Sequence, residues 1–240
     1  VDLITIKGRK LLEEADIVIY AGSLVSKEHL NFCKEECQFY NSASMTLEEV
    51  IDVMEDGLDK GLKLVILHTG DPTIYGAIRE QMDILDEKKI SYEVIPGVSS
   101  FTAACSAIKK EFTLPEVSQT VILTRIEGRT SVPENEDLEK LASYGASMAI
   151  FLSVQQIDNV VDKLKRGYGR EDVPIAVVYK ATWEDEKIVI GTLKNIGEKV
   201  KKEGITKTAQ ILVGDFISGD YERSKLYDPG FTHEYRKASK

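Results

Sequence analysis

The feature that most constrains the fold of this chain is a run of four branched apolar residues, Leu64 to Leu67, that stops at the polar turn His68-Thr-Gly-Asp-Pro72. A run without polar alternation is typical of a strand that is buried on both faces of a parallel sheet. Gly70 permits backbone angles that a side chain forbids, and Pro72 fixes the direction of the chain. The pattern becomes helical after Gly76, so the sequence predicts a strand, a tight turn and a helix.

This turn is a candidate binding loop, because the ligands of open α/β sheets bind at the carboxyl ends of strands. The alternative interpretation is an ordinary connection between a strand and a helix, and the stretch alone does not decide between the two. The turn lacks the lysine and the spacing of a phosphate-binding P-loop, and it lacks the three-glycine fingerprint of dinucleotide-binding proteins. A dehydrogenase that binds a dinucleotide is therefore disfavoured.

The first half of the chain alternates between strands and helices, which predicts a mainly parallel, doubly wound sheet. We place this first α/β domain at residues 1–113, with Asp2 as the N-cap of its first helix and a linker at 112–116. Thr46 and Glu49 form a capping box at the start of another helix. The expected strands are 17–20, 64–67 and 92–95, and the expected helices are 3–15, 27–32, 47–61, 78–88 and 98–108.

The second half, residues 114–240, is expected to form a mixed α/β domain that ends in a polar and aromatic tail from Ser218. Residues 175–179 and 187–192 are two strands separated by too few residues for a helical crossover, so they should pair antiparallel. The other expected strands are 120–123, 148–152 and 210–213, and the expected helices are 136–144, 157–164 and 196–203.

Composition narrows the functional classes. The 240 residues carry a net charge of −9 and no basic stripe, so we expect no nucleic-acid partner. We expect no membrane association, because no apolar run approaches the length of a membrane span and the first residues do not form a signal peptide. Three cysteines, Cys33, Cys37 and Cys105, are too few for a disulfide framework and indicate a reducing, cytoplasmic location.

One cluster has the spacing of a metal site. His29, Cys33 and Cys37 recur every four residues and would share a face of one continuous helix, where they could hold a soft metal. The interpretation that we prefer is a solvated helix end with packed cysteines, because no fourth ligand is evident. We therefore expect no metal.

A second cluster, Arg125, Glu127 and Arg129, follows a predicted strand. Guanidinium groups bind carboxylates in a bidentate fashion, so two arginines here would help an acidic protein to bind a polyanion. The alternative is a solvated turn with an incidental ion pair. No Ser–His–Asp or Cys–His set of the kind used in nucleophilic catalysis stands out.

Two segments, His68-Thr-Gly-Asp-Pro-Thr-Ile-Tyr-Gly76 and Pro96-Gly-Val-Ser-Ser100, resemble the tetrapyrrole (corrin/porphyrin) methylase family. Three others resemble the precorrin-4 and cobalt-precorrin-4 C11-methyltransferase branch of that family: Tyr20–Val25, Thr124–Thr130 and Arg223–His233. The resemblance implies two α/β domains with a cleft between them, and methylation of a precorrin carbon by S-adenosylmethionine (SAM) in cobalamin biosynthesis. Family members begin with a further strand and a glycine-rich loop, which we expect to be missing from the start of this chain.

Carried over residue by residue, the resemblance implies residues that bind the cofactor (the cofactor set), residues that bind the substrate (the substrate set) and a candidate proton acceptor, Glu127. Ser99 and Ser100 stand where the family has a Thr-Ala pair beside the methionine moiety of SAM. The full cofactor set is Gly70, Asp71, Ile74, Ser99, Ser100, Leu152, Ala181, Thr208 and Ala209. The substrate set, which would face the macrocycle or hold its carboxylates, is Ser23, Leu24, Tyr75, Arg125 and Arg129.

Two alternatives stay open. The chain could methylate another tetrapyrrole, such as uroporphyrinogen III or a different precorrin, or it could be a non-catalytic protein that binds SAM or a tetrapyrrole. The resemblance also implies a homodimer. The expected small-molecule partner is a tetrapyrrole (precorrin) substrate, and the sequence does not say whether it carries cobalt.

Overall fold

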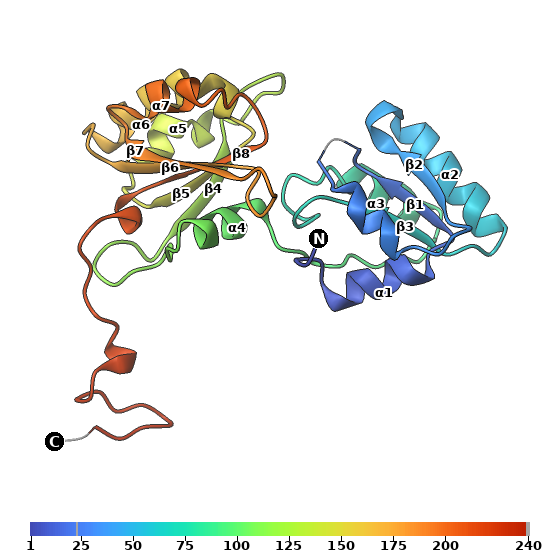
Figure 1. Cartoon of the computed structure of the whole chain (residues 1–240), viewed down its shortest axis with the longest axis horizontal. Coiled ribbons are helices and arrows are strands. Elements are labelled where there is room, and N and C mark those ends of the chain that lie inside the picture. The colour runs from blue at the N-terminus through green and yellow to red at the C-terminus, as the bar shows by residue number, and fades with distance from the viewer. Residues whose placement is uncertain (23, 239–240) are drawn as a thin grey trace. The chain divides into compact units, whose positions relative to one another are not determined.

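The computed structural model describes residues 1–22 and 24–238 (Figure 1). By its internal contacts the chain divides into two units, Val1–Ser99 and Ser100–Lys240, and each unit has its own sheet. Residues 100–113 contact the second unit: Phe101 and Phe112 pack together, with ring centroids 5.8 Å apart, and Phe112 packs on Phe216. The domain boundary expected after residue 113 stays a prediction.

The first unit is built on a parallel sheet of strand order β2-β1-β3, as its alternating pattern predicts. Its strands are β1 (Ile17–Tyr20), β2 (Gln38–Asn41) and β3 (Leu64–Leu67). Strand β2 was not predicted; it is a short strand whose residues are mostly exposed. Because β3 lies at one side of this sheet, its residues are only half-buried, but both of its faces are covered as predicted: Leu64 and Ile66 pack against one core, and Val65 and Leu67 pack against the other.

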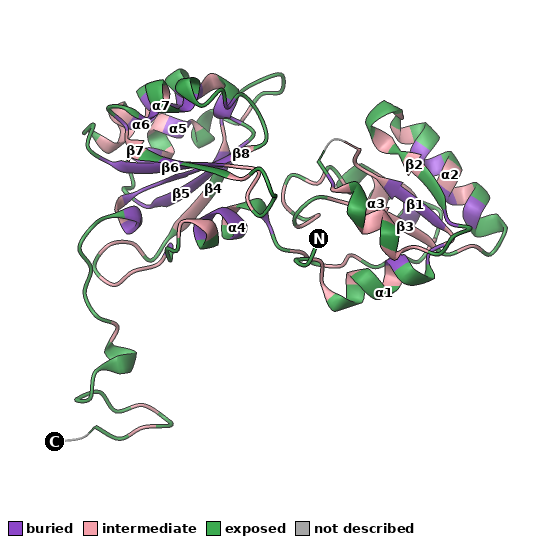
Figure 2. Ribbon diagram, viewed as in Figure 1, coloured by how far each residue is buried: buried purple, intermediate pink, exposed green. Residues whose placement is uncertain are grey.

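Helices cover both faces of the first sheet (Figure 2). Ile17 and Ile19 of β1 form a core with Met54 of α2 and Leu85 of α3, whereas Val18, which points to the opposite face, packs with α1. This arrangement follows from the two-residue repeat of a strand, which alternates side chains between the faces. The helices are α1 (Ile6–Glu14), α2 (Leu47–Asp59) and α3 (Arg79–Glu87).

The helix caps, the helix and the strand that local sequence patterns predict in the first unit are confirmed only in part. The capping box of Thr46 and Glu49 is present, but α1 is capped by Thr5, whose hydroxyl accepts a hydrogen bond from the Gly8 N–H, and not by Asp2. Residues 27–32 form a 3₁₀ helix. Residues 92–95, all within the described chain, form no strand; two of the four are exposed, so pairing them would bury little apolar surface.

The second unit is built on a five-stranded mixed sheet of order β4-β5-β8-β6-β7. Strands β4 and β5 are parallel, and every other neighbouring pair is antiparallel, including the predicted pair of β6 and β7. The bounds are β4 (Val121–Arg125), β5 (Ser147–Phe151), β6 (Pro174–Tyr179), β7 (Lys187–Thr192) and β8 (Ala209–Val213).

Three helices cover one face of the second sheet, and α4 lies on the other (Figure 1). The main core joins inward residues of β5, β6 and β8, such as Ile150, Ile175 and Ile211, to the helices on the first face. The helices are α4 (Ser100–Ala107), α5 (Leu138–Ala142), α6 (Ile157–Tyr168) and α7 (Ile196–Lys202). Across residues 1–22 and 24–238, no helix combines the length and the apolar character that crossing a membrane requires.

Candidate functional site

The loop that follows β3 is held together by the carboxylate of Asp71. Its Oδ1 accepts hydrogen bonds from the backbone N–H of Thr73, at 2.9 Å, and from the Thr73 hydroxyl, at 2.5 Å. Its Oδ2 accepts a bond from the N–H of Gly97, at 3.1 Å, 26 residues along the chain. Asp71 therefore joins the two segments that carry the family resemblance.

Backbone contacts make the same junction close. A Cβ built on Gly97 would lie 2.1 Å from the carbonyl oxygen of Gly70, so only glycine fits at position 97. Gly70 has a φ of +62°, in the left-handed region that glycine adopts most easily. The Thr69 hydroxyl donates to the carbonyl of Leu24 at 2.8 Å, which fixes the loop after β1 beside the loop after β3.

Two opposing effects act on the pKa of Asp71. Its partial burial disfavours the charged form, but the hydrogen bonds from Thr73 and from the N–H of Gly97 favour it and outweigh burial, so the pKa of this carboxyl lies below its ordinary value. The carboxylate is charged at neutral pH and is engaged by the protein itself. Nearby, burial lowers the pKa of His68, which favours the neutral imidazole.

The predicted cofactor residues of the second unit meet at one end of its sheet. Strand β8 runs antiparallel to β5 and β6, and its first residue, Ala209, pairs with Tyr179 at the end of β6. Leu152 directly follows the end of β5, and Ala181 follows the end of β6. The sheet thus brings together four predicted residues that are far apart in the sequence: Leu152, Ala181, Thr208 and Ala209.

This end of the sheet concentrates unusual backbone conformations. Leu152, Lys180, Thr182 and Thr208 all have positive φ, with values of 52°, 45°, 74° and 54°. Leu152 is also 67% exposed, although it is a large apolar residue. Each such residue costs of order 1 kcal/mol, and strain of this kind gathers at ligand sites. The sequence indicated these loops only through the family resemblance.

Ser100, at the start of α4, is connected to the same end of the sheet by a buried glutamine. The Ser100 hydroxyl donates to the side-chain oxygen of Gln210 at 2.9 Å. Gln210 is 4% exposed and lies next to Ala209 in β8. Gln210 was not predicted as a site residue. The sequence feature that could have identified it is its position as a single polar residue in the apolar run Ala-Gln-Ile-Leu-Val of β8.

The loop after β4 contains the predicted arginine clamp, and here Arg125 is already occupied. Its guanidinium donates to the backbone carbonyls of Ile126, Thr130 and Ser131, at 3.2, 3.1 and 2.7 Å. Glu127 and Arg129 are exposed. Of the two arginines, Arg129 is thus the one whose guanidinium is presented at the surface, and the carboxylate role of Arg125 stays a prediction.

A second buried polar residue, Ser153, anchors this loop to the sheet. The Ser153 hydroxyl donates to the Phe151 carbonyl at 2.6 Å and accepts from the Ile126 N–H at 3.0 Å. It fixes the distance between the end of β4 and the end of β5. The anchoring role of Ser153 was not predicted, because nothing in the local sequence pattern distinguishes it from a surface serine.

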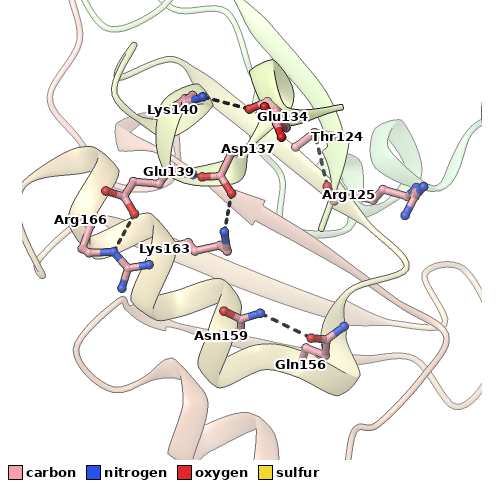
Figure 3. A network of polar contacts seen from close by, with 10 residues as sticks. All are labelled: Thr124, Arg125, Glu134, Asp137, Glu139, Lys140, Gln156, Asn159, Lys163 and Arg166. Carbon is pink, nitrogen blue, oxygen red and sulfur yellow. Dashed lines mark hydrogen bonds and ion pairs between the residues drawn. The ribbon is translucent and has the colours of Figure 1, made fainter. Parts of the chain in front are cut away.

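A cavity of about 280 Å³ lies between the segment that follows β4, the start of α5 and α6. Some of its lining residues belong to the network of polar contacts in Figure 3, in which Asp137 pairs with Lys163 and Asn159 donates to Gln156. The same network includes the pair of Glu139 and Arg166. The ammonium of Lys163 lowers the pKa of Asp137. Of the charged residues that line the cavity, Asp137 and Lys163 are therefore paired with each other, and Glu127 is exposed.

The spacing of His29, Cys33 and Cys37 does not produce a shared helical face. The 3₁₀ helix ends at Phe32, so both cysteines lie beyond it. Cys37 is buried, and burial raises the pKa of its thiol to about 11. Among residues 1–22 and 24–238, no group of three or more His, Cys, Asp or Glu side chains is arranged to hold a metal ion.

The remaining predicted residues are on the first unit. Ser99 is buried, Leu24 and Tyr75 are exposed, and Tyr75 has a φ of +55°. Ile74 donates its N–H to the Asp71 carbonyl at 3.2 Å, in the turn that Asp71 organises. Ser23 lies outside the described residues.

A family model described as Tetrapyrrole (Corrin/Porphyrin) Methylases matches residues 1–197. The chain is 59% identical over 240 residues to the cobalt-precorrin-4 C(11)-methyltransferase of Methanocaldococcus jannaschii, with 100% of this chain and 93% of the relative covered. It is 31% identical to the uroporphyrinogen-III C-methyltransferase of Bacillus subtilis, with 90% of this chain and 46% of that relative covered.

Solved structures agree with this similarity. The X-ray structure of a cobalt precorrin-4 methyltransferase, described as a cobalamin biosynthetic enzyme, matches with a TM-score of 0.89 and 46% identity over 90% of this chain and 91% of that chain. A uroporphyrin-III C-methyl transferase from Thermus thermophilus, in complex with S-adenosyl homocysteine, matches with a TM-score of 0.74 over 90% of this chain and 93% of that chain. At 21% identity, the second similarity concerns the fold alone.

Proposed function

The chain belongs to the tetrapyrrole methylase family, and we propose that it is a SAM-dependent methyltransferase that acts on C11 of cobalt-precorrin-4 or precorrin-4 in cobalamin biosynthesis. The observation that carries the proposal is the 59% identity to a cobalt-precorrin-4 C(11)-methyltransferase over the whole chain. Two relatives named for the cobalt-containing substrate are 59% and 46% identical, and two named for precorrin-4 are 42% and 40% identical. This order favours the cobalt-containing substrate.

The residues of both units suit a cofactor that is recognised mainly through backbone atoms. The loop after β3 keeps the Asp71 carboxylate for itself and approaches Gly97 so closely that no side chain fits between them. At the end of the second sheet, positive-φ residues such as Leu152 and Thr208 turn the backbone sharply. We propose two sets of SAM-binding residues: Gly70, Asp71, Ile74 and Ser99 in the first unit, and Ser100, Leu152, Ala181, Thr208 and Ala209 in the second.

The chemistry that we propose needs placement more than acid–base catalysis. When bound, SAM supplies a methyl group on a sulfonium, which is a strong donor without further activation. The residues above then have one main task, which is to hold donor and acceptor carbon in line, and such placement can lower a barrier by about 7–11 kcal/mol. Leu24, Tyr75, Arg129 and, once its present bonds open, Arg125 are proposed for the macrocycle, with Glu127 as a candidate proton acceptor.

A labelling experiment tests the proposal. The purified protein is incubated with methyl-labelled SAM and, in separate reactions, with cobalt-precorrin-4, precorrin-4 and uroporphyrinogen III. We expect label in the first product, and mass and NMR spectra that place one new methyl group on C11. Label in uroporphyrinogen III alone would replace the proposed substrate, and SAM binding without transfer to any of the three would support a non-catalytic binding protein.

We also propose that the protein is a homodimer of a reducing, cytoplasmic compartment. The support for the compartment is that all three cysteines are free thiols and that burial raises the pKa of Cys37 and of Cys105 to about 11, which keeps both protonated at neutral pH. The support for the dimer is the family alone. Light scattering coupled to size-exclusion chromatography measures the mass directly, and a monomer mass at micromolar concentration would contradict the dimer.

A further inference from the structure

Gln210 is a buried polar residue that the proposed chemistry does not use. It is 4% exposed as the second residue of β8, and the residues after it, Ile211 and Leu212, are fully buried. A buried amide is costly unless it is hydrogen-bonded, and an apolar residue of similar size would fill the same space without that cost. Packing therefore does not explain why a glutamine is here.

The orientation of the Gln210 amide is fixed by its own hydrogen bonds. The Nε2 group donates to the Ile150 carbonyl at 3.1 Å and to the Ile211 carbonyl at 3.4 Å. A flipped amide would direct its oxygen at these two carbonyl oxygens, which only accept. The Oε1 atom must therefore face Ser100, 2.9 Å from its hydroxyl oxygen.

This arrangement decides what the Ser100 hydroxyl can do. A serine has one proton to donate and two lone pairs that accept. Because Gln210 Oε1 is an acceptor, the proton of Ser100 points at it, and the lone pairs are directed elsewhere. Donation to Gln210 also polarises the hydroxyl and makes it a better acceptor. Ser100 is exposed, so a ligand can reach it.

We propose that Gln210 is a positioning residue that turns Ser100 into a hydrogen-bond acceptor for the α-ammonium group of SAM. The inference rests on the proposed function. The α-ammonium group only donates and carries a positive charge, and a bond from a charged donor is about twice as strong as a neutral one. A hydroxyl that is free to rotate could instead donate to a carboxylate, and the bond to Gln210 excludes that.

The test compares two ligands on matched variants by isothermal titration calorimetry. The ligands are S-adenosylhomocysteine and an analogue in which hydrogen replaces the α-amino group. The variants are Ser100→Ala, Gln210→Met and their combination, with Ser106→Ala on the same helix as the control. Circular dichroism checks that each variant is folded, and Ser100→Ala keeps the test valid if Gln210→Met does not fold.

We expect Ser100→Ala and Gln210→Met each to weaken S-adenosylhomocysteine binding by about tenfold. The combined variant should be no weaker than either one, because both changes remove the same bond. All variants should bind the analogue without the amino group as the unmodified protein does, and Ser106→Ala should change neither affinity.

Every other result contradicts either this inference or the proposed function. If the unmodified protein does not bind S-adenosylhomocysteine, the proposed function itself fails, and the inference fails with it. If it binds and Ser100→Ala binds equally well, the inference fails and the proposed function stands. An equal loss for both ligands would exclude the ammonium group as the partner. A loss in Ser100→Ala but not in a folded Gln210→Met would exclude the positioning role.

Discussion

Two polar loops of this molecule each follow a strand and are built in opposite ways. The loop after β3 is organised by the anion Asp71, which accepts from the N–H groups of Thr73 and Gly97. The loop after β4 is organised by the cation Arg125, which donates to three backbone carbonyls. In both loops the charged residue that the sequence suggests for ligand binding is engaged by the backbone of its own unit.

The difference between the loops lies in what the charged residue joins. Asp71 connects segments 26 residues apart, and the junction is so close that Gly97 cannot carry a side chain. Arg125 closes a loop on itself, with partners only one to six residues away. A long-range junction constrains two elements at once, so we expect changes in the first loop to cost more than equivalent changes in the second.

The largest effect is expected from Gly97→Ala. The new methyl group would lie 2.1 Å from the Gly70 carbonyl oxygen, with backbone on both sides of the contact. We expect the free energy of unfolding to fall by about 3 kcal/mol in urea titrations, and binding of S-adenosylhomocysteine to be lost.

The matched control in the second loop is Gly128→Ala. A methyl group there meets only the Gln156 amide nitrogen, at an ordinary 3.8 Å, so the free energy of unfolding should change by less than about 0.5 kcal/mol. Equal losses of unfolding free energy in Gly97→Ala and Gly128→Ala would show that both loops tolerate a side chain equally, and would contradict the expected difference between them.

Asp71→Asn is expected to have the next largest effect. An amide keeps one acceptor for Thr73, but its other end presents N–H to the N–H of Gly97 or leaves that N–H without a partner. The loss should be about 2 kcal/mol in the free energy of unfolding and about tenfold in the affinity for S-adenosylhomocysteine. Unchanged calorimetric affinity would show that the Asp71 junction does not shape the cofactor site.

The two arginines of the second loop should separate stability from substrate binding. Arg125→Met removes three hydrogen bonds to carbonyls and should lower the free energy of unfolding by about 1–2 kcal/mol. Arg129→Gln alters an exposed side chain, so the unfolding midpoint should not move, while the Michaelis constant for the tetrapyrrole rises several-fold. If Arg129→Gln keeps the unmodified Michaelis constant, neither arginine acts as a carboxylate clamp.

The smallest effect is a dependence on pH that belongs to the first loop. The folded pKa of Asp71 lies below its ordinary value of 3.8, so its contribution to stability is complete above that value and is lost as pH falls through the folded pKa. The difference in unfolding free energy between the unmodified protein and Asp71→Asn should therefore narrow as the pH falls below 3.8. A difference that stays constant below this pH would mean that the charge of Asp71 contributes nothing to the junction.

Much of the fold could be read from local patterns. Apolar runs predicted β1 and β3, the capping box predicted α2, and the short spacing of β6 and β7 predicted their antiparallel pairing. The polar strand β2 was missed, and residues 92–95 were wrongly assigned, because strand formation depends on a neighbour as well as on the residues themselves.

The candidate site was less accessible to sequence reasoning, for a physical reason. The resemblance pointed to these loops, but the bonds that organise them depend on three-dimensional proximity. Gln210 meets Ser100 across 110 residues, and Gly97 meets Asp71 across 26. Arg125 could be identified as a charged loop residue, but only the backbone geometry shows that carbonyls already occupy its guanidinium.

The residues with positive φ at the end of the second sheet have a consequence for the engineering of thermal stability. Glycine relieves the strain at Leu152, Thr182 or Thr208, so a library ranked by melting temperature alone will favour glycine at these positions. Each gain in heat resistance would remove a side chain from a proposed ligand-contacting edge. Such variants would be more stable to heat and have a lower catalytic rate, which is the usual trade-off between stability and activity.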